Sequence, residues 1–600
     1  MHYAYLSIGA LAVAGLGGVR CCGRSVVCLG VHHKGLVAIK PHYDKLVVDP
    51  EDERLPEVSV AVLKRAFERL NLAEREAVLR ERLVPVAWLP HITLYADGND
   101  GAQPLAVIPQ KKVVARIAPR TFAAIVLSSW GHDLTKRACN ELKLSQPTFS
   151  SSQRVSSGQQ LWVMGLMLAV VLLWPLLSFA TVLDVASFIL TSLFACMIWL
   201  RLLAISERAE PYMAKPEMND DALPVYSILV PLFRETRVLP QLISALQKLN
   251  YPANKLDIKL ILEQTDTVMR RKVASLSLPT TMEVIVVPAS HPQTKPKALN
   301  YALPFARGQL VTIYDAEDIP EPMQLRMAAA AFAKLPHQIA CLQAELTFYN
   351  PNENWLTRQF TMEYAVLFKL VLPALAINHL PLPLGGTSNH FRIDVLRQLG
   401  GWDPYNVTED ADIGIRLARY GFYARSLASC TYEEANTELR NWLQQRARWM
   451  KGFLQSWLVH MRNPVLLLRQ IGFTGFLVVQ AMLIGVVLSA TLYPVFLGLT
   501  ALFLWNTYLN LTEPSLIKVL FEGSYLGFFF IGWGIMILSG AMALRRKGYF
   551  GWWGTLLTLP IYCMLTSIAG WMALWQFIHA PFQWNKTRHG LSRFQAKVVK

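Results

Sequence analysis

Residues 310–320 read LVTIYDAEDIP, and this stretch decides the fold. Its first five residues are mostly apolar and β-branched, which predicts a short buried strand. Asp315, Glu317 and Asp318 follow directly, just past the carboxyl end of that strand. Ligands of open α/β sheets bind at this end, and crowded carboxylates need a counter-charge such as a divalent cation. A solvent-exposed acidic loop is the alternative interpretation of the acidic residues alone.

Strands and helices alternate on both sides of this stretch. The pattern predicts strands at 225–233, 258–262, 282–287 and 339–346, and helices at 238–249, 296–306 and 322–335. Such alternation is typical of a mostly parallel, Rossmann-like sheet with both faces covered. Glu263 and Asp266 follow one predicted strand as Asp315 follows another. Both sets should therefore lie at the same edge of the sheet, where a nucleotide would bind.

The composition points to a membrane protein. Of the 600 residues, 53% are hydrophobic, and the formal net charge is +16. Nucleic acid binding would explain this charge, but the sequence contains neither zinc-finger spacing nor an RNA-binding aromatic signature. Basic cytoplasmic loops and anionic lipid headgroups explain it better, so we expect no nucleic acid partner. The eight cysteines are scattered, which is typical of reduced thiols in a protein that faces the cytoplasm.

Several apolar stretches are long enough to cross about 30 Å of hydrocarbon. They occupy residues 160–180, 182–204, 472–506, 523–543 and 553–577, and the third is long enough for two spans. Arg201, Arg208 and Lys215 follow the first pair and mark a cytoplasmic end. Four later spans would return the tail to the cytoplasm but leave the basic residues 545–547 outside, against the positive-inside rule. The span count is therefore open, with a re-entrant segment as one alternative.

Shifts in composition divide the chain further. We expect a leader of uncertain status at 1–34, a soluble N-terminal domain with a Ser-rich linker at 35–158, a transmembrane hairpin at 159–205, a cytosolic domain at 206–465, a transmembrane bundle at 466–580 and a basic cytosolic tail at 581–600. Helical periodicity predicts helices at 58–83 and 132–147. Residues 354–380 and 439–462 predict amphipathic helices in the membrane interface, and packed core helices are the alternative.

Two further motifs carry charge at predicted helix starts. TKPKALN, residues 294–300, places Lys295 and Lys297 where cations are unfavourable unless a bound phosphate shares that helix end. A solvated lysine pair is the alternative. NVTEDADIGIRLARYG, residues 406–421, places Glu409 and Asp410 in a first helical turn, which the helix dipole alone would explain.

A third motif, QQRARW at 444–449, gathers Gln445, Arg448 and Trp449 within about one helical turn. A hydrogen-bonding amide, a phosphate-binding guanidinium and a flat aromatic face then share a small region. Anchoring of Arg and Trp at the membrane surface is the alternative.

Together these motifs resemble those of family-two glycosyltransferases, and the chain is similar to bacterial cellulose synthase catalytic subunits and exopolysaccharide β-glucan synthases over about 160–591. Asp315-Ala-Glu317 resembles the DxD element, Thr408-Glu409-Asp410 the TED motif, and Gln445-Arg-Ala-Arg448-Trp449 the QxxRW motif. Glu317 departs from the usual second Asp. Residues 584–588, WNKTR, resemble a gating-loop motif with an inserted lysine, which weakens any role for Thr587 and Arg588. Because no PilZ-type segment follows the last predicted span, we expect no built-in cyclic-di-GMP switch.

The resemblance implies a GT-A-type domain embedded between transmembrane helices, with a small soluble N-terminal domain. It implies Asp410 as general base with Glu409 beside it, and Mg²⁺ or Mn²⁺ bound by Asp315 and Glu317. Donor contacts fall to Glu263, Asp266, Lys295, Asp315 and Arg448, and acceptor contacts to Gln445 and Trp449.

We therefore expect a multi-pass enzyme of the bacterial inner membrane with a cytosolic catalytic domain. It would polymerise a nucleotide sugar, most simply UDP-glucose, into an exopolysaccharide with inversion and export the product, with a periplasmic export subunit as one partner. One alternative is a single transfer to a lipid. The other is a non-catalytic membrane receptor or scaffold that uses the same fold.

Overall fold

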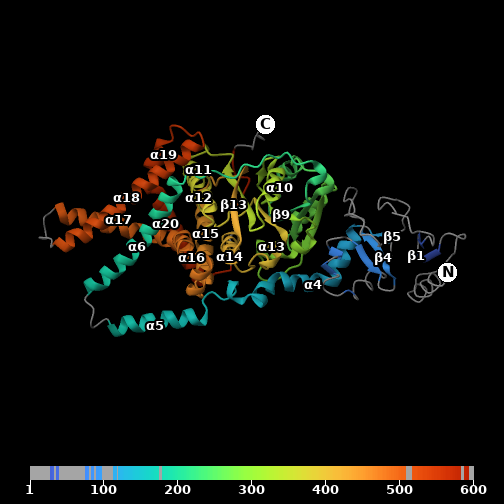
Figure 1. Ribbon diagram of the computed structural model, residues 1–600, viewed down its shortest axis with the longest axis horizontal. Helices are drawn as coiled ribbons and strands as arrows, with labels where there is room; N and C mark the ends of the chain where they lie inside the picture. The colour runs from blue at the N-terminus through green and yellow to red at the C-terminus, as the bar shows by residue number, and fades with distance from the viewer. Residues whose placement is uncertain are drawn as a thin grey trace.

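The computed structural model describes residues 27–32, 35–39, 70, 75–76, 78–79, 83–86, 89–96, 112–117, 119–173, 179–508, 516–582 and 587–593. Figure 1 shows small N-terminal sheets at one end, an α/β domain in the middle and long helices at the other end. The N-terminal strands are β1 (Val27–His32), β2 (Gly35–Ile39), β3 (Leu83–Val86), β4 (Leu89–Ala96) and β5 (Lys112–Ile117). Most of the predicted helix 58–83 and most of the predicted leader lie outside the described residues; residues 75–76 and 78–79 are helical, and Leu83 already belongs to β3.

The α/β domain is built on one mixed sheet. In the described residues its eight strands follow the order β10-β13-β11-β12-β9-β6-β7-β8. Their bounds are β6 (Tyr226–Leu232), β7 (Leu256–Glu263), β8 (Met282–Val287), β9 (Leu310–Ile313), β10 (Ile319–Pro320), β11 (Ile339–Phe348), β12 (Asn389–Arg392) and β13 (Tyr423–Glu433). The β9-β6-β7-β8 half and the β11-β13 pair are parallel, whereas β12 and β10 pair antiparallel. The predicted mostly parallel α/β fold is confirmed.

The chain reverses its direction of strand addition at β6. Strands β7 and β8 are added on one side of β6, and β9 is then added on the other side. Such a switch point opens a crevice at the carboxyl ends of the two central strands, here β6 and β9. The acidic stretch after β9 therefore begins in that crevice.

Helices cover both faces of the sheet because successive strand side chains point to opposite sides. Leu229 of β6 joins a core with α9 (Lys295–Ala302), α13 (Ile393–Gln398) and α14 (Glu409–Arg419). Its neighbours Ile228 and Val230 join the opposite core with α7 (Leu239–Gln247), α8 (Thr267–Ala274) and α10 (Gln324–Lys334). All four residues of β9 are buried, as its apolar sequence predicts.

Among the described residues, four helical stretches are long and apolar enough to cross a membrane. They are Trp355–Ile377, Pro464–Gly498, Gly527–Arg546 and Leu559–His579. The first comprises α11 (Trp355–Val366), a π-helical turn (Leu367–Val371) and α12 (Leu372–Ile377), and 72% of its apolar window is buried by protein. This burial favours the packed-helix alternative over a helix open to lipid. The other predicted interfacial helix is α15 (Leu439–His460), which packs along α20 (Leu559–His579).

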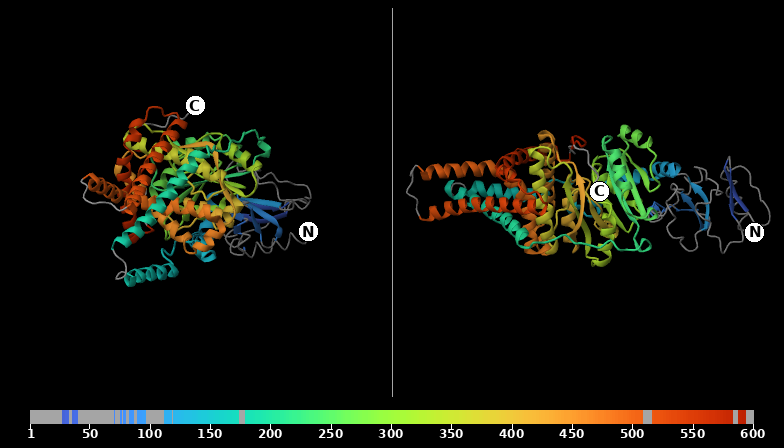
Figure 2. Two further views of the ribbon diagram at one scale, coloured as in Figure 1. Left: turned by 60° about the vertical axis from the view of Figure 1, so that its left-hand side comes forward. Right: turned by 90° about the horizontal axis from the view of Figure 1, so that it is seen from above.

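The prediction of two spans within 472–506 is wrong. The segment forms α16 (Pro464–Val479), a π-helical segment (Gln480–Gly485) and α17 (Val486–Tyr508), with no turn after Gly472. Gly472 has φ 70°, a conformation that glycine adopts without steric cost, and it kinks the helix near its start. One long helix therefore leaves the domain here, and α18 (Leu516–Arg546) is packed against α6 (Phe179–Ser206), which lies between the two long helices (Figure 2).

The basic residues after α18 lie against the α/β domain. Arg546 donates to the carbonyls of Ala209 and Lys369, and Lys547 forms an ion pair with Glu345. Both ends of α20 also contact this domain. At its start Trp355 Nε1 donates to Thr558 Oγ1 at 2.8 Å, and past its end Gln455 Nε2 donates to the Pro581 carbonyl at 3.0 Å. Hydrogen bonds to α11 and α15 thus hold the two ends of α20.

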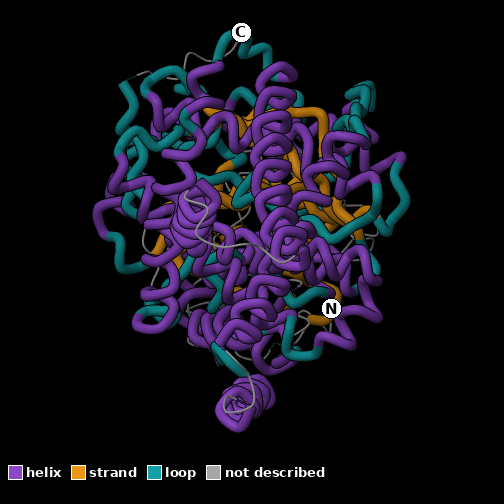
Figure 3. Tube along the Cα trace, turned by 90° about the vertical axis from the view of Figure 1, so that its left-hand side faces the viewer, coloured by secondary structure: helices purple, strands orange, loops and turns teal. Residues whose placement is uncertain are grey.

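The predicted hairpin corresponds to α5 (Ser157–Leu173) and α6 (Phe179–Ser206). Their described apolar stretches, Ser157–Val171 and Phe194–Ser206, are shorter than a full span, so the hairpin stays a prediction. Figure 1 shows α5 below the remaining helices, and Figure 3 shows the same separation end-on.

The predicted short helix 132–147 is the longer α4 (Pro119–Ser145), which packs against α9. The Ser-rich linker after it is docked on the domain. Arg462 donates to the carbonyls of Pro147, Thr148, Ser150 and Gln153 at 2.6–3.0 Å. Ser151 N–H also donates to Asp403 Oδ2 at 2.5 Å. Composition alone suggested a linker. These contacts hold residues 147–153, which we call the strap, against the residues just past the end of α15.

Candidate active site

Lys295 stands at the first position of α9, with its side chain aimed across the crevice. Its ammonium lies 2.6 Å from Asp315 Oδ1 and donates to the Gly386 carbonyl at 2.7 Å. Burial alone would lower the pKa of Lys295, but Asp315, Glu409 and Asp410 outweigh burial and raise it. Lys295 therefore stays charged and joins the loops after β9 and before β12.

Asp410 approaches the same loop from α14. Thr408 is the N-cap of that helix, and Glu409 and Asp410 occupy its first turn. A Cβ built on Gly386 would lie 3.3 Å from Asp410 Oδ2, so Asp410 and Lys295 meet at Gly386. Burial raises the pKa of Asp410, and the Lys295 and Arg448 cations oppose that shift. Burial and then Asp410 also raise the pKa of Glu409.

Arg448 and Trp449 reach this region from α15. The Arg448 Nη1 lies 3.5 Å from the Val407 carbonyl, just before the Thr408 cap. Trp449 stacks on Tyr364, with 6.2 Å between ring centroids and 29° between ring planes. Gln445, one turn earlier, accepts a hydrogen bond from Asn436 at 2.8 Å. The structure therefore brings Asp315, Asp410 and Arg448 around one crevice, as the motifs predict.

A glycine permits the two helices to meet. Gly452 of α15 is buried against Thr408, and a Cβ there would lie 2.8 Å from Thr408 Cβ and closer still to its Oγ1 and Cγ2. Any larger residue would push the start of α14 away from α15. The sequence motifs do not contain this residue.

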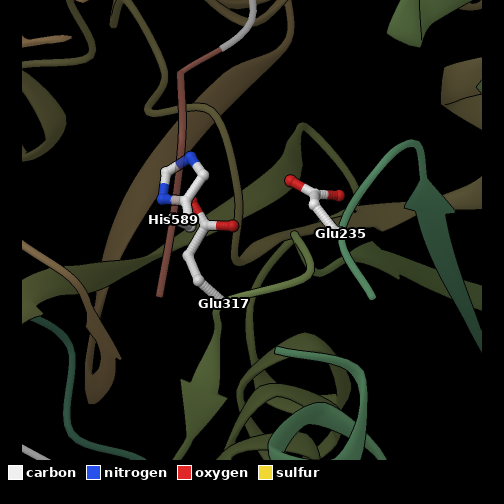
Figure 4. Close-up of side chains that lie close together, drawn as sticks. All are labelled: Glu235, Glu317 and His589. Carbon is white, nitrogen blue, oxygen red and sulfur yellow. The ribbon is translucent and has the colours of Figure 1, made fainter. Parts of the chain in front are cut away.

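The carboxylates of the acidic stretch point in different directions. Glu317 contacts His589 at 3.1 Å between Oε1 and Nδ1, and Glu235 faces them from the loop after β6 (Figure 4). One ligand atom from each of these three residues lies within 4.8 Å of the others. Oxygen and imidazole ligands suit Mn²⁺, and oxygen ligands suit Mg²⁺. Among the described residues this group could hold an ion, and it contains the predicted Glu317 but not Asp315.

The sequence analysis missed Glu235 and His589. His589 comes directly after the WNKTR motif, and Glu235 follows the β6 strand just as Asp315 follows β9. His589 is positioned by a pinned loop, because Glu434 accepts hydrogen bonds from the N–H groups of residues 590, 591 and 592 at 2.6–2.8 Å. The side-chain amide of Asn441 also donates to the Arg588 carbonyl and accepts from the Arg588 N–H.

Two residues predicted to contact the nucleotide-sugar donor, Glu263 and Asp266, are hydrogen bonded to other residues of the protein. Glu263 receives both its carboxylate contacts from Lys297 Nζ, at 2.8 and 3.0 Å, and both side chains are buried. Lys297 is therefore neither a solvated lysine nor a second phosphate ligand in this structure. Asp266 caps α8, since its oxygens accept from Met269 N–H at 3.0 Å and Arg234 N–H at 2.6 Å. Nucleotide contacts by Glu263 and Asp266 stay predictions.

Asp318, the third acid of the stretch, has a different position. It is fully buried, and its Oδ2 accepts from Asp315 N–H at 2.7 Å and from the Thr387 hydroxyl. Burial, then Asp315 and Glu317, raise the pKa of Asp318 well above its usual range. The hydrogen bonds from Asp315 N–H and Thr387 hold the acidic loop in place from below.

This arrangement is that of α/β enzymes that bind phosphate-bearing nucleotides at a topological switch point. Residues 310–512 match the family model described as glycosyl transferase family group 2. This part of the chain is similar to the family-two glycosyltransferases, as its motifs implied.

Several curated proteins are similar to this chain. It is 25% identical over 238 residues to the probable glycosyltransferase YdaM of Bacillus subtilis (strain 168), covering 39% of this chain and 56% of that protein. It is 25% identical over 244 residues to a probable glucomannan 4-beta-mannosyltransferase 1 of Arabidopsis thaliana, covering 39% and 44%. It is 24% identical over 253 residues to a beta-monoglucosyldiacylglycerol synthase of Trichormus variabilis (strain ATCC 29413 / PCC 7937), covering 42% and 53%. The chain thus spans about half the length of the curated relatives it matches.

Among solved structures, the mannosyltransferase PcManGT from Pyrobaculum calidifontis, in complex with GDP-Man and Mn²⁺, has a TM-score of 0.37 and 17% identity. The match covers 66% of this chain and 99% of that one. A score this low adds nothing to the fold derived above.

Proposed function

We propose that this chain is an inverting hexosyltransferase that moves a sugar from a nucleoside diphosphate donor to an acceptor hydroxyl at a membrane surface. The observation that carries the proposal is the meeting of Lys295, Asp315 and Asp410 around Gly386. A cation and a buried carboxylate on facing sides of one crevice suit a leaving diphosphate and an attacking hydroxyl, respectively.

Asp410 acts as the general base in this proposal. It accepts the proton of the acceptor hydroxyl while the hydroxyl oxygen bonds to the anomeric carbon and the bond from that carbon to the diphosphate breaks. A single displacement inverts the anomer, so an α-linked donor gives a β-linkage. The raised pKa of Asp410 makes its carboxylate a stronger base than an exposed one.

Lys295 and Arg448 stabilise the negative charge that grows on the leaving diphosphate. Lys295 is held for this task by Asp315, and Arg448 lies beside the start of α14. Trp449 offers an aromatic face for the acceptor sugar. Gln445 lies on the same helix and contacts the acceptor in this proposal.

The residues that fit a divalent ion are Glu317, Glu235 and His589, with two carboxylates and an imidazole close together. A bound Mg²⁺ or Mn²⁺ would neutralise diphosphate charge as a Lewis acid. His589 belongs to the loop pinned by Glu434, so the ion site and the C-terminal loop are built together.

Two of the relatives are named for mannosyl or glucosyl products. We therefore compare UDP-glucose, the donor expected from the resemblance, with GDP-mannose. We also propose the expected bacterial inner-membrane location with the catalytic domain in the cytosol. In that topology α17 crosses the membrane away from the cytosol and α18 crosses back, which keeps Arg545, Arg546 and Lys547 on the cytosolic side. Helix α20 then lies along α15 without crossing the membrane. Extension of the product into an exopolysaccharide and its export are the finer parts of this proposal.

The test uses the purified full chain with Mn²⁺ and radiolabelled UDP-glucose or GDP-mannose. Transfer of label by the wild type and its loss in Asp410→Asn support the proposal. The matched control is Asp394→Asn, because Asp394 is exposed and pairs with His337 rather than with any residue of these motifs. Wild-type rates in Asp410→Asn would remove that residue from its role, and a protein that consumes neither donor would favour the scaffold alternative. Gel filtration of the product separates polymer from single transfer.

A further inference from the structure

A cavity of about 460 Å³ lies between the catalytic domain and the long helices. Ligand pockets occupy roughly 300–1,000 Å³, so a substantial molecule fits this space. Its walls come from α6, α11, α15, α17, α18 and α20. Two lining residues, Leu384 and Trp449, are adjacent in sequence to Gly385 and Arg448. The cavity therefore adjoins the candidate active site through Trp449.

The walls are mainly aliphatic and aromatic. They include Met197, Ile198, Leu367, Val371, Met482, Val486, Phe528 and Phe529. A sugar chain lying here would leave most of its hydroxyls without hydrogen-bond partners, which is costly in an apolar environment. A hydrocarbon chain forms no hydrogen bonds with water, so it would lose none on entering this cavity.

Two helix irregularities face this cavity. The π-helical turn after α11 supplies Leu367 and Val371, and the π-helical segment before α17 supplies Ala481 and Met482. Such segments are rare and occur frequently at functional sites. Both are packed against α6, which also lines the cavity. Two independent departures from α-helix at one cavity indicate that its shape is used.

The charges of the lining are unbalanced. Arg201, Arg446 and Glu363 are its charged residues. Arg446 donates to both oxygens of Glu363, at 2.6 Å from Nη1 to Oε1, and also to the Tyr562 hydroxyl at 3.0 Å. Arg201 donates to the neutral Ser539 hydroxyl at 3.0 Å. The lining therefore holds two guanidiniums and one carboxylate, and that carboxylate, Glu363, binds Arg446 directly and acts on Arg201 only through space. Ionisable groups among membrane helices mark functional sites.

We propose that the acceptor is an anionic lipid whose hydrocarbon chain occupies this cavity and whose phosphate lies near Arg201. The inference rests on the proposed function, because it names the acceptor of that reaction. The lipid's hydroxyl-bearing end reaches past Trp449 to Asp410. The extended glycan expected from the sequence then grows on a lipid anchor.

A matched pair of glycines on α18 tests the cavity. Gly532 lines it, and a Cβ there would lie 3.4 Å from Ile198, an ordinary contact that preserves helix packing. Gly534 has nothing within 4 Å and is not part of the lining. Gly532→Leu therefore fills the cavity, whereas Gly534→Leu adds the same side chain elsewhere on the same helix.

The full chain and both variants are purified from membranes containing phosphatidylglycerol or diacylglycerol with identical acyl chains, and retained lipid is quantified by mass spectrometry. We expect Gly532→Leu to retain on the order of tenfold less phosphatidylglycerol than the wild type and Gly534→Leu to retain as much as the wild type. Equal retention by the two variants would overturn the cavity assignment. Equal retention of diacylglycerol and phosphatidylglycerol by the wild type would overturn the role of Arg201.

Hydrolysis of the nucleotide sugar by the same preparations, without lipid acceptor, separates this inference from the proposed function. Donor hydrolysis in all three proteins, with lipid retention untouched by Gly532→Leu, refutes the inference alone. Lipid retention that follows the cavity, without consumption of either donor, refutes the acceptor role and the proposed function but leaves a lipid site.

Discussion

Replacing Gly452 with alanine tests whether the close contact between α15 and the start of α14 assembles the site. The added Cβ would lie 2.8 Å from Thr408 Cβ, whereas ordinary contacts begin at 3.4 Å. The two helices must therefore separate by at least about 0.6 Å, and misplacement of about 1 Å can cost roughly 100-fold in rate. Because Thr408 is followed directly by Glu409 and Asp410, this shift moves the carboxylates away from Arg448.

We expect Gly452→Ala to lower kcat/KM by about 10- to 100-fold and the free energy of unfolding by about 1–3 kcal/mol, the usual cost of overpacking. Sugar transfer from the nucleotide donor and thermal unfolding of the full chain measure the two effects. The control is Gly498→Ala, because a Cβ at that position on α17 meets nothing within 4 Å.

A double variant sharpens the test. Serine at 408 lacks the Cγ2 that crowds the new methyl, and its single hydroxyl can rotate away. Thr408→Ser combined with Gly452→Ala should therefore recover part of the activity lost by the single variant. Wild-type activity in Gly452→Ala would refute the reasoning, and so would a complete lack of rescue.

Three further predictions follow from charge and hydrogen bonding. Burial raises the pKa of Asp410, and a general base must be ionised to act. On acidification kcat/KM should therefore fall with a midpoint above roughly pH 3.9, the pKa of an ordinary Asp. A midpoint of the pH profile at or below that value contradicts the assignment. The pKa of Glu409 in the folded protein lies above its value in the unfolded chain, so the free energy of unfolding should fall as the pH rises from about 4.3 through the raised pKa. Glu409→Gln should flatten this pH dependence in denaturant titrations. The same pH dependence in Glu409→Gln and the wild type counts against this role of Glu409. Arg462→Gln removes a charged donor to four strap carbonyls and should destabilise the strap by on the order of 1–3 kcal/mol, seen as faster proteolysis within 146–156; the same rate in Arg462→Gln and the exposed control Arg440→Gln would contradict this.

Local sequence patterns were sufficient for strands β6, β7, β8, β9 and β11, whereas β10, β12 and β13 of the same sheet were not predicted. The β9 strand is short, apolar and followed by acids, so its burial and the direction of its carboxyl end follow from local chemistry. The same reasoning located α9 and α14 by their first turns. It failed at 472–506, because a long apolar helix and two shorter ones have the same composition, and only the continuous backbone hydrogen bonds distinguish them.

The candidate site was predicted where residue type is tied to a motif and missed where it depends on a distant partner. Lys295 and Lys297 are two positions apart and look equivalent in sequence, yet one contacts Asp315 and the other Glu263. Successive positions on a helix face different directions, so the neighbouring elements decide each role. His589 and Glu235 lie more than three hundred residues apart, and no local pattern joins them.

The sequence by itself determined the class of fold, the order of the motifs and the apolar helices, because these depend on residue type and periodicity over short stretches. Only the tertiary structure decided which carboxylates face one another, that Gly452 lets α15 meet α14, and that an apolar cavity adjoins Trp449. Those features arise where elements far apart in the chain pack together. The free energy of each such contact depends on both segments, so neither segment's sequence predicts it alone.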